Sequence, residues 1–397
     1  MFPHAQKHLF GLIDTGIDVN TDRRTEILEM FPVPQVRENK AIHMAPFGTE
    51  VQTTVMINNC EMMTTKKGDP MLKMKVYDSM GTYQANVFHK PGLDLKYAKE
   101  EVVDKYPFID IVAKVEEFPK GSGKKTLQIT NMSVDTDKKR SPDAYLGYLP
   151  KCSADMSDII VEVYLILDTL KEPHRSVALN ALKKYWDKFI LSPAATRHHH
   201  AYLFGLLEHT WGLLRLGYFL TQDRSKDPVS KASALYMKIA DNALVTLKAF
   251  KESDTGVIPE NIRSFENTMS HMYSIMVNMT KQMVNKKTRE VDYDFVLAAI
   301  IWHDMGKINE YSIEGGINRD PLMGIAEHRV IGPLMFQNFL QEENIVLEDK
   351  VYWHYINVMA SHHGKVEWGS PAIPATIEGW LVHLVDFLDA GFQGTNK

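Results

Sequence analysis

The hydrophobic pattern of this chain changes its period once, near residue 140, and that change separates two kinds of fold. From Glu50 to about Asp137, apolar and polar residues alternate, which is typical of strands with one buried face. From about Pro142 onwards, apolar residues recur at positions i, i+3, i+4 and i+7, which is typical of amphipathic helices. The sequence therefore predicts a multidomain α+β protein, with a β-domain over residues 50–140 and an all-α domain over residues 141–397.

Five strand-like segments lie in the first region. They are EVQTTVMINN from Glu50, MLKMKVYD from Met71, TYQANVF from Thr82, FIDIVAKVEEF from Phe108 and KTLQITNMSV from Lys125. The turn DSMG joins the second segment to the third, and a helix-like stretch, DLKYAKEEVVDKY, precedes the fourth. This order predicts a small Greek-key barrel of the OB type.

Basic side chains lie where OB barrels bind oligonucleotides, which is one sheet face and its flanking loops. The candidates on two loops and one strand are Lys66, Lys67, Lys73, Lys75, Lys120, Lys124 and Lys125. Residues 50–140 contain 15 basic and 13 acidic side chains, whereas the rest of the chain contains 30 and 37. The net charge is therefore positive in the barrel region and negative elsewhere, which favours a polyanion near the barrel. For any single lysine, a solvated side chain in a loop is an equally good explanation.

Composition excludes several classes of protein. Two cysteines, Cys60 and Cys152, are too few for a disulfide scaffold or a four-thiolate metal site. The longest apolar run, which ends at Trp302, is far shorter than the roughly twenty residues that a membrane span needs. The N-terminal residues lack the layout of a signal peptide. We therefore expect a soluble cytoplasmic protein with no membrane partner.

Histidine is unevenly distributed, since 11 of the 16 histidines lie between His198 and His383. The segment VLAAIIWHDMGKI carries an apolar helix directly into His303 and Asp304, and Lys307 follows one helical turn later. Such a pair at the end of an apolar stretch needs a partner or a metal. Taken alone, an ordinary hydrogen-bonded His–Asp pair would explain it equally well.

Other segments add histidine and aspartate side chains from separate helices. They supply His209 in LFGLLEHT, His328 in AEHRVIGP, His362 and His363 in VMASHHGK, and Asp386 in WLVHLVDFLDA. Imidazole and carboxylate ligands that converge from several helices are how helical bundles build two-metal sites. Each histidine alone would be interpreted as a core residue, but the ordered set predicts a metal site.

The order of these motifs resembles the signature of HD-domain phosphohydrolases. More specifically, RHHHAYLFGLLEHT, IIWHDMGKI, EHRVIG and SHHGKVEWGSP, followed by VDFLDA, are similar to the YhaM-type 3′→5′ exoribonucleases. That family also has an OB barrel before its HD domain, and the likeness covers about residues 50–390. The resemblance implies an N-terminal OB-type β-barrel followed by an all-α HD-domain helical bundle.

The resemblance also implies a role for each matching side chain. A first metal would be bound by His209, His303, Asp304 and Asp386. Asp304 would bridge to a second metal, held by His328, His362 and His363. Lys307 would act with Asp304 in catalysis, beside the scissile phosphate. Substrate contacts are implied for Arg197, His199 and His200, for which a polar helix start is an equally good explanation.

The chain departs from the family pattern at several positions. Phe204 and Glu327 stand where the family usually has glycine, and Asp389 is a neighbouring alternative to Asp386 that fits the family register less well. The stretch of about residues 222–287 is longer than the family's connection, and it predicts an added lid, a partner surface or a contact in a homo-oligomer. Residues 1–49 form an N-terminal extension to which the sequence assigns no role.

The predicted cofactors are two divalent metal ions. Mixed histidine and aspartate ligation suits transition metals better than an all-oxygen Mg²⁺ site, and the family suggests Mn²⁺, with Fe²⁺, Co²⁺ or Mg²⁺ as alternatives. The leading prediction is a metal-dependent 3′→5′ exonuclease that hydrolyses single-stranded RNA, with DNA as an alternative substrate, to nucleoside monophosphates. Two other functions stay open: a phosphohydrolase of mononucleotides or cyclic dinucleotides, and a non-catalytic nucleic-acid-binding factor.

Overall fold

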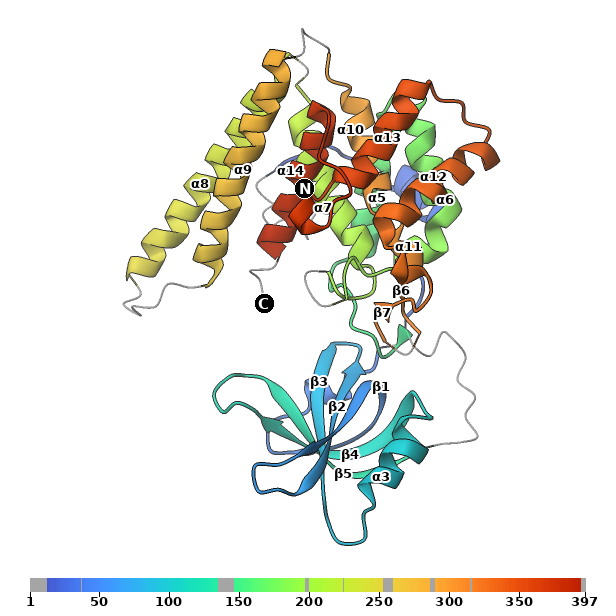
Figure 1. The fold of residues 1–397 in the computed structure, drawn as a ribbon, viewed down its shortest axis with the longest axis vertical. Helices are drawn as coiled ribbons and strands as arrows, with labels where there is room; N and C mark the ends of the chain where they lie inside the picture. The colour runs from blue at the N-terminus through green and yellow to red at the C-terminus, as the bar shows by residue number, and fades with distance from the viewer. Residues whose placement is uncertain are drawn as a thin grey trace.

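The computed structural model of the chain describes residues 13–36, 38–134, 146–196, 200–223, 225–252, 260–285, 290–314 and 316–393. Figure 1 shows a β-barrel beneath a larger helical domain. The predicted fold class, a barrel of the OB type followed by a helical region, is confirmed.

The barrel is closed and consists of five strands in the order β1-β2-β3-β5-β4. The strands are β1 (Glu50–Thr64), β2 (Pro70–Asp78), β3 (Gly81–Phe88), β4 (Phe108–Glu117) and β5 (Lys125–Ser133). Only β3 and β5 pair in parallel. A short helix, α3 (Leu95–Tyr97), continues into the π-helical turn η3 (Ala98–Val103) before β4. Side chains of β2 alternate between the barrel interior and the solvent, since Leu72 and Met74 are buried while Lys73 is exposed. This alternation is what the sequence pattern predicts for a strand with one buried face.

The helical domain is built around α10 (Tyr293–His303), in which every residue is buried. The other long helices of its body are α5 (Met156–Asp168), α6 (His174–Leu191), α7 (Gly205–Thr221), α12 (His328–Glu342), α13 (Asp349–Ser361) and α14 (Ile377–Gln393). Because α10 packs against α6, α7, α13 and α14, it is apolar on all sides rather than amphipathic.

Short elements connect these helices near the barrel. They are α11 (Lys307–Glu310), β6 (Tyr311–Ser312), β7 (Asn318–Arg319), η4 (Met323–Ile325) and η5 (Val366–Trp368). The strands β6 and β7 pair with each other in a two-residue antiparallel ladder. The helical period of the sequence gives no sign of such a short ladder.

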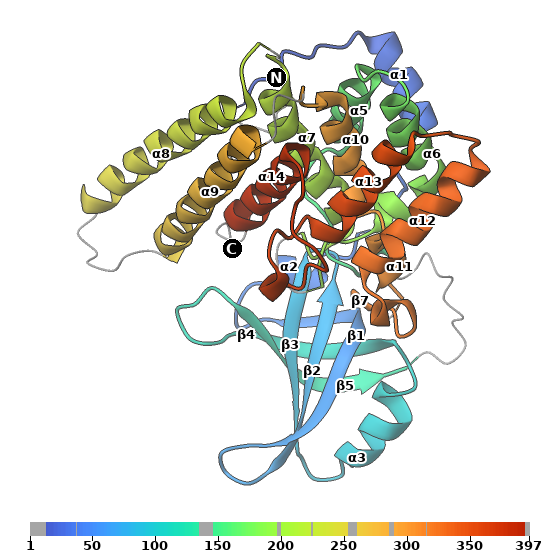
Figure 2. The same ribbon diagram turned by 45° about the horizontal axis from the view of Figure 1, so that its top comes forward.

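The predicted insertion contains a helical hairpin, α8 (Pro228–Glu252) and α9 (Glu260–Asn285). Figures 1 and 2 show this hairpin at one side of the helical domain, with α9 lying along α14. Among the helices that the structure describes, none combines the length and apolar character required to cross a membrane.

The described part of the N-terminal extension belongs to both domains. Helix α1 (Thr21–Met30) packs on α5, and Ile27 and Phe31 lie in the core of the helical domain. Helix α2 (Ala41–Met44) instead buries Ile42 in the core of the barrel. The barrel is therefore inserted in the chain between two segments of the helical domain.

Candidate metal centre

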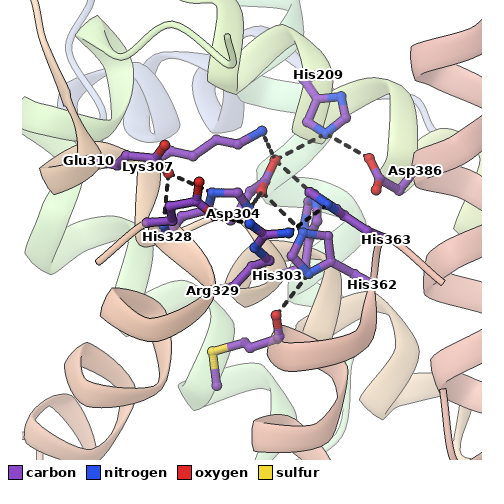
Figure 3. Close-up of polar contacts among 12 residues, drawn as sticks. His209, His303, Asp304, Lys307, Glu310, His328, Arg329, His362, His363 and Asp386 are labelled. Carbon is purple, nitrogen blue, oxygen red and sulfur yellow. Dashed lines mark hydrogen bonds and ion pairs between the residues drawn. The ribbon is translucent and has the colours of Figure 1, made fainter. Parts of the chain in front are cut away.

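Five helices bring the seven predicted metal ligands together (Figure 3). His209 lies within α7, His303 is the last residue of α10, and Asp304 follows it as the C-cap. His328 is the first residue of α12, His362 caps the C-terminal end of α13, and Asp386 comes from α14. Ligands at helix ends are held by the packing of whole helices rather than by loops.

Asp304 lies at the centre of this cluster, and each of its oxygens faces two imidazoles. Its Oδ2 is 3.4 Å from His209 Nε2 and 3.3 Å from His303 Nε2. Its Oδ1 is 3.5 Å from His328 Nε2 and 3.6 Å from His362 Nε2. The buried carboxylate therefore has one oxygen for each of two cation sites, which is the geometry of a bridging ligand.

Hydrogen bonds at the opposite ring nitrogens hold the imidazoles in place. The Nδ1 atoms of His303 and His362 donate to the carbonyl oxygens of Ile300 and Met359, at 2.6 and 2.9 Å. A ring that donates from Nδ1 keeps its lone pair on Nε2, the atom that faces Asp304. This arrangement is the one that metal-binding histidines have in proteins.

Carboxylates hold two further rings in the same way. His328 Nδ1 lies 2.6 Å from Glu310 Oε2, and His209 Nδ1 lies 2.5 Å from Asp389 Oδ2. Neither carboxylate was among the predicted site residues, but both are fully buried. In the sequence, only spacing points to these two carboxylates. Glu310 lies one helical turn after Lys307, and Asp389 lies one turn after Asp386.

Several polar atoms at the centre of the cluster lack a hydrogen-bond partner among the described residues. They are Nε2 of His303, His328 and His362, and Oδ1 of Asp304. Burying each such atom unsatisfied costs about 1–3 kcal/mol, so their gathering at one point calls for a ligand. A cation satisfies imidazole lone pairs and carboxylate oxygens together, and the residues present therefore fit the predicted metal ions.

Two groups of possible ligands match the two predicted metals. One group is His209, His303 and Asp304, and the other is His328, His362 and His363; within each group the ligand atoms lie within 4.8 Å of one another. A third group, which shares His209 with the first, adds His200 and Asp389. Asp386 belongs to none of these groups, but its Oδ1 lies 3.4 Å from His209 Nε2, so the structure brings all the predicted metal ligands into one cluster.

Asp304, His362 and His363 have protonation states that suit cations, whereas the carboxylates around His209 outweigh burial and raise the pKa of its imidazole well above 6.5. Burial would raise the pKa of Asp304, but the nearby charge of Lys307 outweighs burial and, with hydrogen bonding from the neighbouring histidines, holds the pKa well below 3.8. Burial lowers the pKa of His362 well below 6.5, and burial is also the largest cause that lowers the pKa of His363 to about 4. At neutral pH the carboxylate is therefore ionised and these two imidazoles are neutral, as metal ligation requires.

Lys307 brings a positive charge to the same point. Its Nζ lies 2.6 Å from Asp304 Oδ2 (Figure 3). Burial lowers the pKa of Lys307, but the charge of Asp304 more than compensates, so the pKa lies above 10.5. Lys307 is thus cationic at neutral pH, beside the central carboxylate.

Gly306 allows α12 to begin against the His303–Asp304 turn. A Cβ at this position would lie 2.8 Å from the backbone nitrogen of Gly332 and would collide with the carbonyl oxygen of His328. Only glycine permits this approach, which explains its place in the motif HDMGK.

Comparisons with known proteins extend over both domains. No family model matches the chain. Curated relatives named 3′-5′ exoribonuclease YhaM include those of Oceanobacillus iheyensis, 24% identical over 348 residues, and Bacillus pumilus, 23% identical over 361 residues. The first alignment covers 86% of this chain and 84% of the relative, and the second covers 88% of each. The chain resembles the YhaM exoribonucleases. Because the aligned stretch is longer than either domain, the similarity to YhaM includes parts of both the barrel and the helical domain.

Two predicted departures from YhaM-type sequences have an unusual backbone. Phe204 has φ 68°, and Glu327 has φ 57° and ψ 158°. Glycine adopts both conformations readily, whereas side chains with a Cβ are strained there. Glycine would therefore be unstrained at both positions, and this chain adopts the same conformations with Phe204 and Glu327.

The structure describes only one of the three residues predicted to contact substrate before His209. Arg197 and His199 lie outside the described residues. His200 is buried behind the metal cluster, where its Nε2 is 3.0 Å from Asp389 Oδ2 and its Nδ1 is 3.2 Å from Glu208 Oε2. In this position His200 supports Asp389, which in turn holds the ring of His209.

The predicted barrel lysines lie in different environments. Lys66 and Lys67 are exposed in the turn between β1 and β2, which Figure 2 shows at the end of the barrel far from the helices. Lys73 and Lys75 are exposed on β2, and Lys124 is exposed in the loop before β5. A substrate role for these five residues stays a prediction.

Lys125 differs from the other lysines because its ammonium is engaged within the protein. Its Nζ donates to the carbonyl oxygens of Ile42 at 3.0 Å and Ala45 at 2.7 Å, and also to that of His43. These carbonyls belong to α2 and its C-cap. Lys125 thus holds α2 against the barrel in this structure.

Proposed function

We propose that this protein is a metal-dependent 3′→5′ exonuclease that hydrolyses single-stranded RNA to nucleoside monophosphates. The observation that carries the proposal is the convergence of four imidazole Nε2 atoms on the two oxygens of Asp304. The names of the relatives support polarity and substrate, and Mn²⁺ suits the mixed nitrogen and oxygen ligands.

Each residue of the cluster has a task in this proposal. His209, His303 and Asp386 would hold one cation and His328, His362 and His363 the other, with Asp304 shared between them. Two divalent ions supply Lewis-acid charge to a phosphodiester and make water more acidic at neutral pH. Lys307, whose charge is fixed by Asp304, would bind a non-bridging phosphoryl oxygen and stabilise the negative charge that develops there.

The carboxylates behind the cluster would maintain its geometry. Glu310 accepts hydrogen bonds from both the backbone nitrogen of His328, at 2.7 Å, and its Nδ1. Asp389 accepts from His209. Because the rings cannot turn, their Nε2 atoms stay directed at Asp304 during a reaction cycle.

The test uses 5′-labelled RNA and DNA oligonucleotides with and without Mn²⁺. We expect a ladder that shortens from the 3′ end with RNA only when the cation is present. Asp304→Asn should lose metal binding and hydrolysis but keep oligonucleotide binding, whereas Asp187→Asn, on the exposed side of α6, should behave like the unchanged protein. Full cleavage by Asp304→Asn contradicts the proposal. Hydrolysis of only mononucleotides or cyclic dinucleotides would assign the site to small substrates instead.

A further inference from the structure

A polar cleft lies between the barrel and the helical domain. Its volume is about 540 Å³, within the roughly 300–1,000 Å³ of ordinary ligand sites. The barrel contributes Asn58, Asn59 and Lys75, and the helical domain contributes Thr196 and the segment Ile317–Arg319. The cleft is thus built by both domains.

The cleft leads toward the metal centre through Arg319. One guanidinium nitrogen of Arg319 is 3.3 Å from Glu310 Oε1, and the other oxygen of Glu310 is 2.6 Å from His328 Nδ1. A single carboxylate therefore separates the wall of the cleft from a predicted metal ligand. On the opposite side, Lys75 lies on the exposed face of β2, so the cleft extends from the barrel surface to Arg319, the residue that pairs with Glu310.

A direct hydrogen bond joins the two walls. Asn58 Nδ2 on β1 donates to Asn318 Oδ1 on β7 at 3.1 Å. Gly316 has φ 125°, and a Cβ at that position would collide with the amide nitrogen of Asn58. The close approach of the β6–β7 turn to the barrel therefore depends on a glycine.

The chemistry of the lining fits a sugar–phosphate backbone. Lys75 and Arg319 supply positive charge, and three asparagines and a threonine supply amide and hydroxyl groups that pair with phosphate oxygens and ribose hydroxyls. The Arg319 side chain is 52% exposed, and its ion pair with Glu327 is of the weak surface kind that a phosphate can replace, whereas its other partner, Glu310, is buried.

We infer that this cleft binds the nucleotides that precede the scissile bond, with Lys75 and Arg319 on their phosphates. The inference rests on the proposed function, because it places the 3′ end at the metal cluster and the rest of a single-stranded RNA across β2. The cleft binds RNA by its backbone, so binding is independent of base sequence and sensitive to salt.

The test measures binding separately from hydrolysis. The affinity of the full chain for a 5′-fluorescein octaribonucleotide is measured by fluorescence anisotropy in EDTA, over a range of salt concentrations. The variants are Lys75→Gln and Arg319→Gln. The matched controls are Lys114→Gln, an exposed lysine on β4, and Arg175→Gln, whose side chain is 40% exposed and also pairs with two carboxylates.

We expect each cleft variant to weaken binding about tenfold and to reduce the slope of log K against log salt by about 0.7. Lys75→Arg, which keeps the charge, should restore binding, and the controls should stay within about twofold of the unchanged protein. Unaltered affinity and salt slope in both cleft variants overturn the inference, even if the unchanged protein degrades RNA. Failure of the unchanged protein to degrade RNA overturns the proposed function.

Discussion

Asp389 holds two imidazoles with one oxygen atom. Its Oδ2 is 2.5 Å from His209 Nδ1 and 3.0 Å from His200 Nε2, and all three side chains are buried. The charge of this carboxylate makes the His209 ring a stronger electron donor at Nε2. In the proposed metal site, Asp389 would therefore act on a cation through His209.

Replacing Asp389 with asparagine removes this charge but nearly preserves the shape. We expect Asp389→Asn to weaken Mn²⁺ binding about 10- to 100-fold, because carboxylates behind metal-binding histidines have effects of this size. Isothermal titration calorimetry measures the change, and Asp187→Asn is the control. Wild-type affinity in Asp389→Asn would show that His209 does not need the carboxylate.

Glu327 stores backbone strain next to the site. Its φ and ψ of 57° and 158° lie in a region that only glycine occupies readily. We expect Glu327→Gly to raise the free energy of unfolding by about 1 kcal/mol, since relief of about 1–3 kcal/mol of strain is offset by lost pairing with Arg319 and Arg329. Denaturant unfolding tests this, and a destabilised variant would show that the ion pairs dominate.

Single residues show where sequence reasoning succeeds. His303 and Asp304 were predicted together because a histidine and a carboxylate at the end of an apolar helix need a partner or a metal. The position of Lys125 was not predictable, because its carbonyl partners come from α2, more than eighty residues earlier. Glu310 was missed for a similar reason, since its partner His328 lies on another helix. Spacing along one helix is visible in sequence, whereas pairing between elements requires the fold.

Strands and helices were predicted more reliably than their partners. The segment MLKMKVYD was expected as a strand from residue 71, and β2 runs from Pro70 to Asp78. The helix-like stretch before the fourth strand is present as α3 and η3. By contrast, the packing of α1 on α5 leaves no trace in the pattern of either segment, because amphipathic periodicity identifies a buried face but not what covers it.

The α8–α9 hairpin is attached to α14 through a pair of imidazoles. His383 Nδ1 donates to the carbonyl oxygen of His362 at 2.6 Å, so its Nε2 accepts a hydrogen bond from His271 Nε2 at 3.0 Å. Rings of Trp368 and Phe387 pack against His271, with centroids 4.7 and 4.3 Å away. Burial, assisted by the neighbouring His383, lowers the pKa of His271 to about 4.

This shift makes the attachment of the hairpin depend on pH. Because His271 has a lower pKa in the folded state than in the unfolded state, the unfolded chain binds a proton first as pH falls. The stabilisation is fully present above about pH 6.5 and is lost progressively down to about pH 4. Between pH 7 and pH 5 we expect His271 to account for a loss of about 1–2 kcal/mol.

Comparison with His271→Phe isolates this contribution. Phenylalanine keeps the ring contacts but does not titrate, so the variant should lose less stability between pH 7 and pH 5 than the unchanged protein. Hydrogen exchange in α9 at the two pH values reports the local effect. An identical pH dependence in the two proteins would assign the titration to other groups.

At the scale of the whole molecule, a buried ion pair connects the N-terminal segment to the helical domain. Glu162 on α5 accepts hydrogen bonds from Arg215 Nη1, at 2.6 Å, and from the Thr15 hydroxyl, at 2.7 Å. Arg215 also donates to the carbonyl oxygen of Ile13. Both charged side chains are at most 1% exposed.

Removing one member of this pair leaves the other charge buried. We expect Arg215→Met to lower the free energy of unfolding by about 3–5 kcal/mol. The double variant Arg215→Met/Glu162→Gln should recover about 1–3 kcal/mol, because no buried charge remains. Urea unfolding of the single and double variants completes the cycle. A loss below about 1 kcal/mol in Arg215→Met would show that water compensates the carboxylate.

The insertion of the barrel between α1 and α5 limits how it can move. A domain joined by one linker can move away from its neighbour. Here the chain enters the barrel from one segment of the helical domain and returns to another, so the barrel is attached at both ends. The Asn58–Asn318 hydrogen bond adds a third point of attachment between the two domains. If RNA binds in the cleft as proposed, these attachments would keep the barrel and the helical domain on either side of the strand throughout turnover.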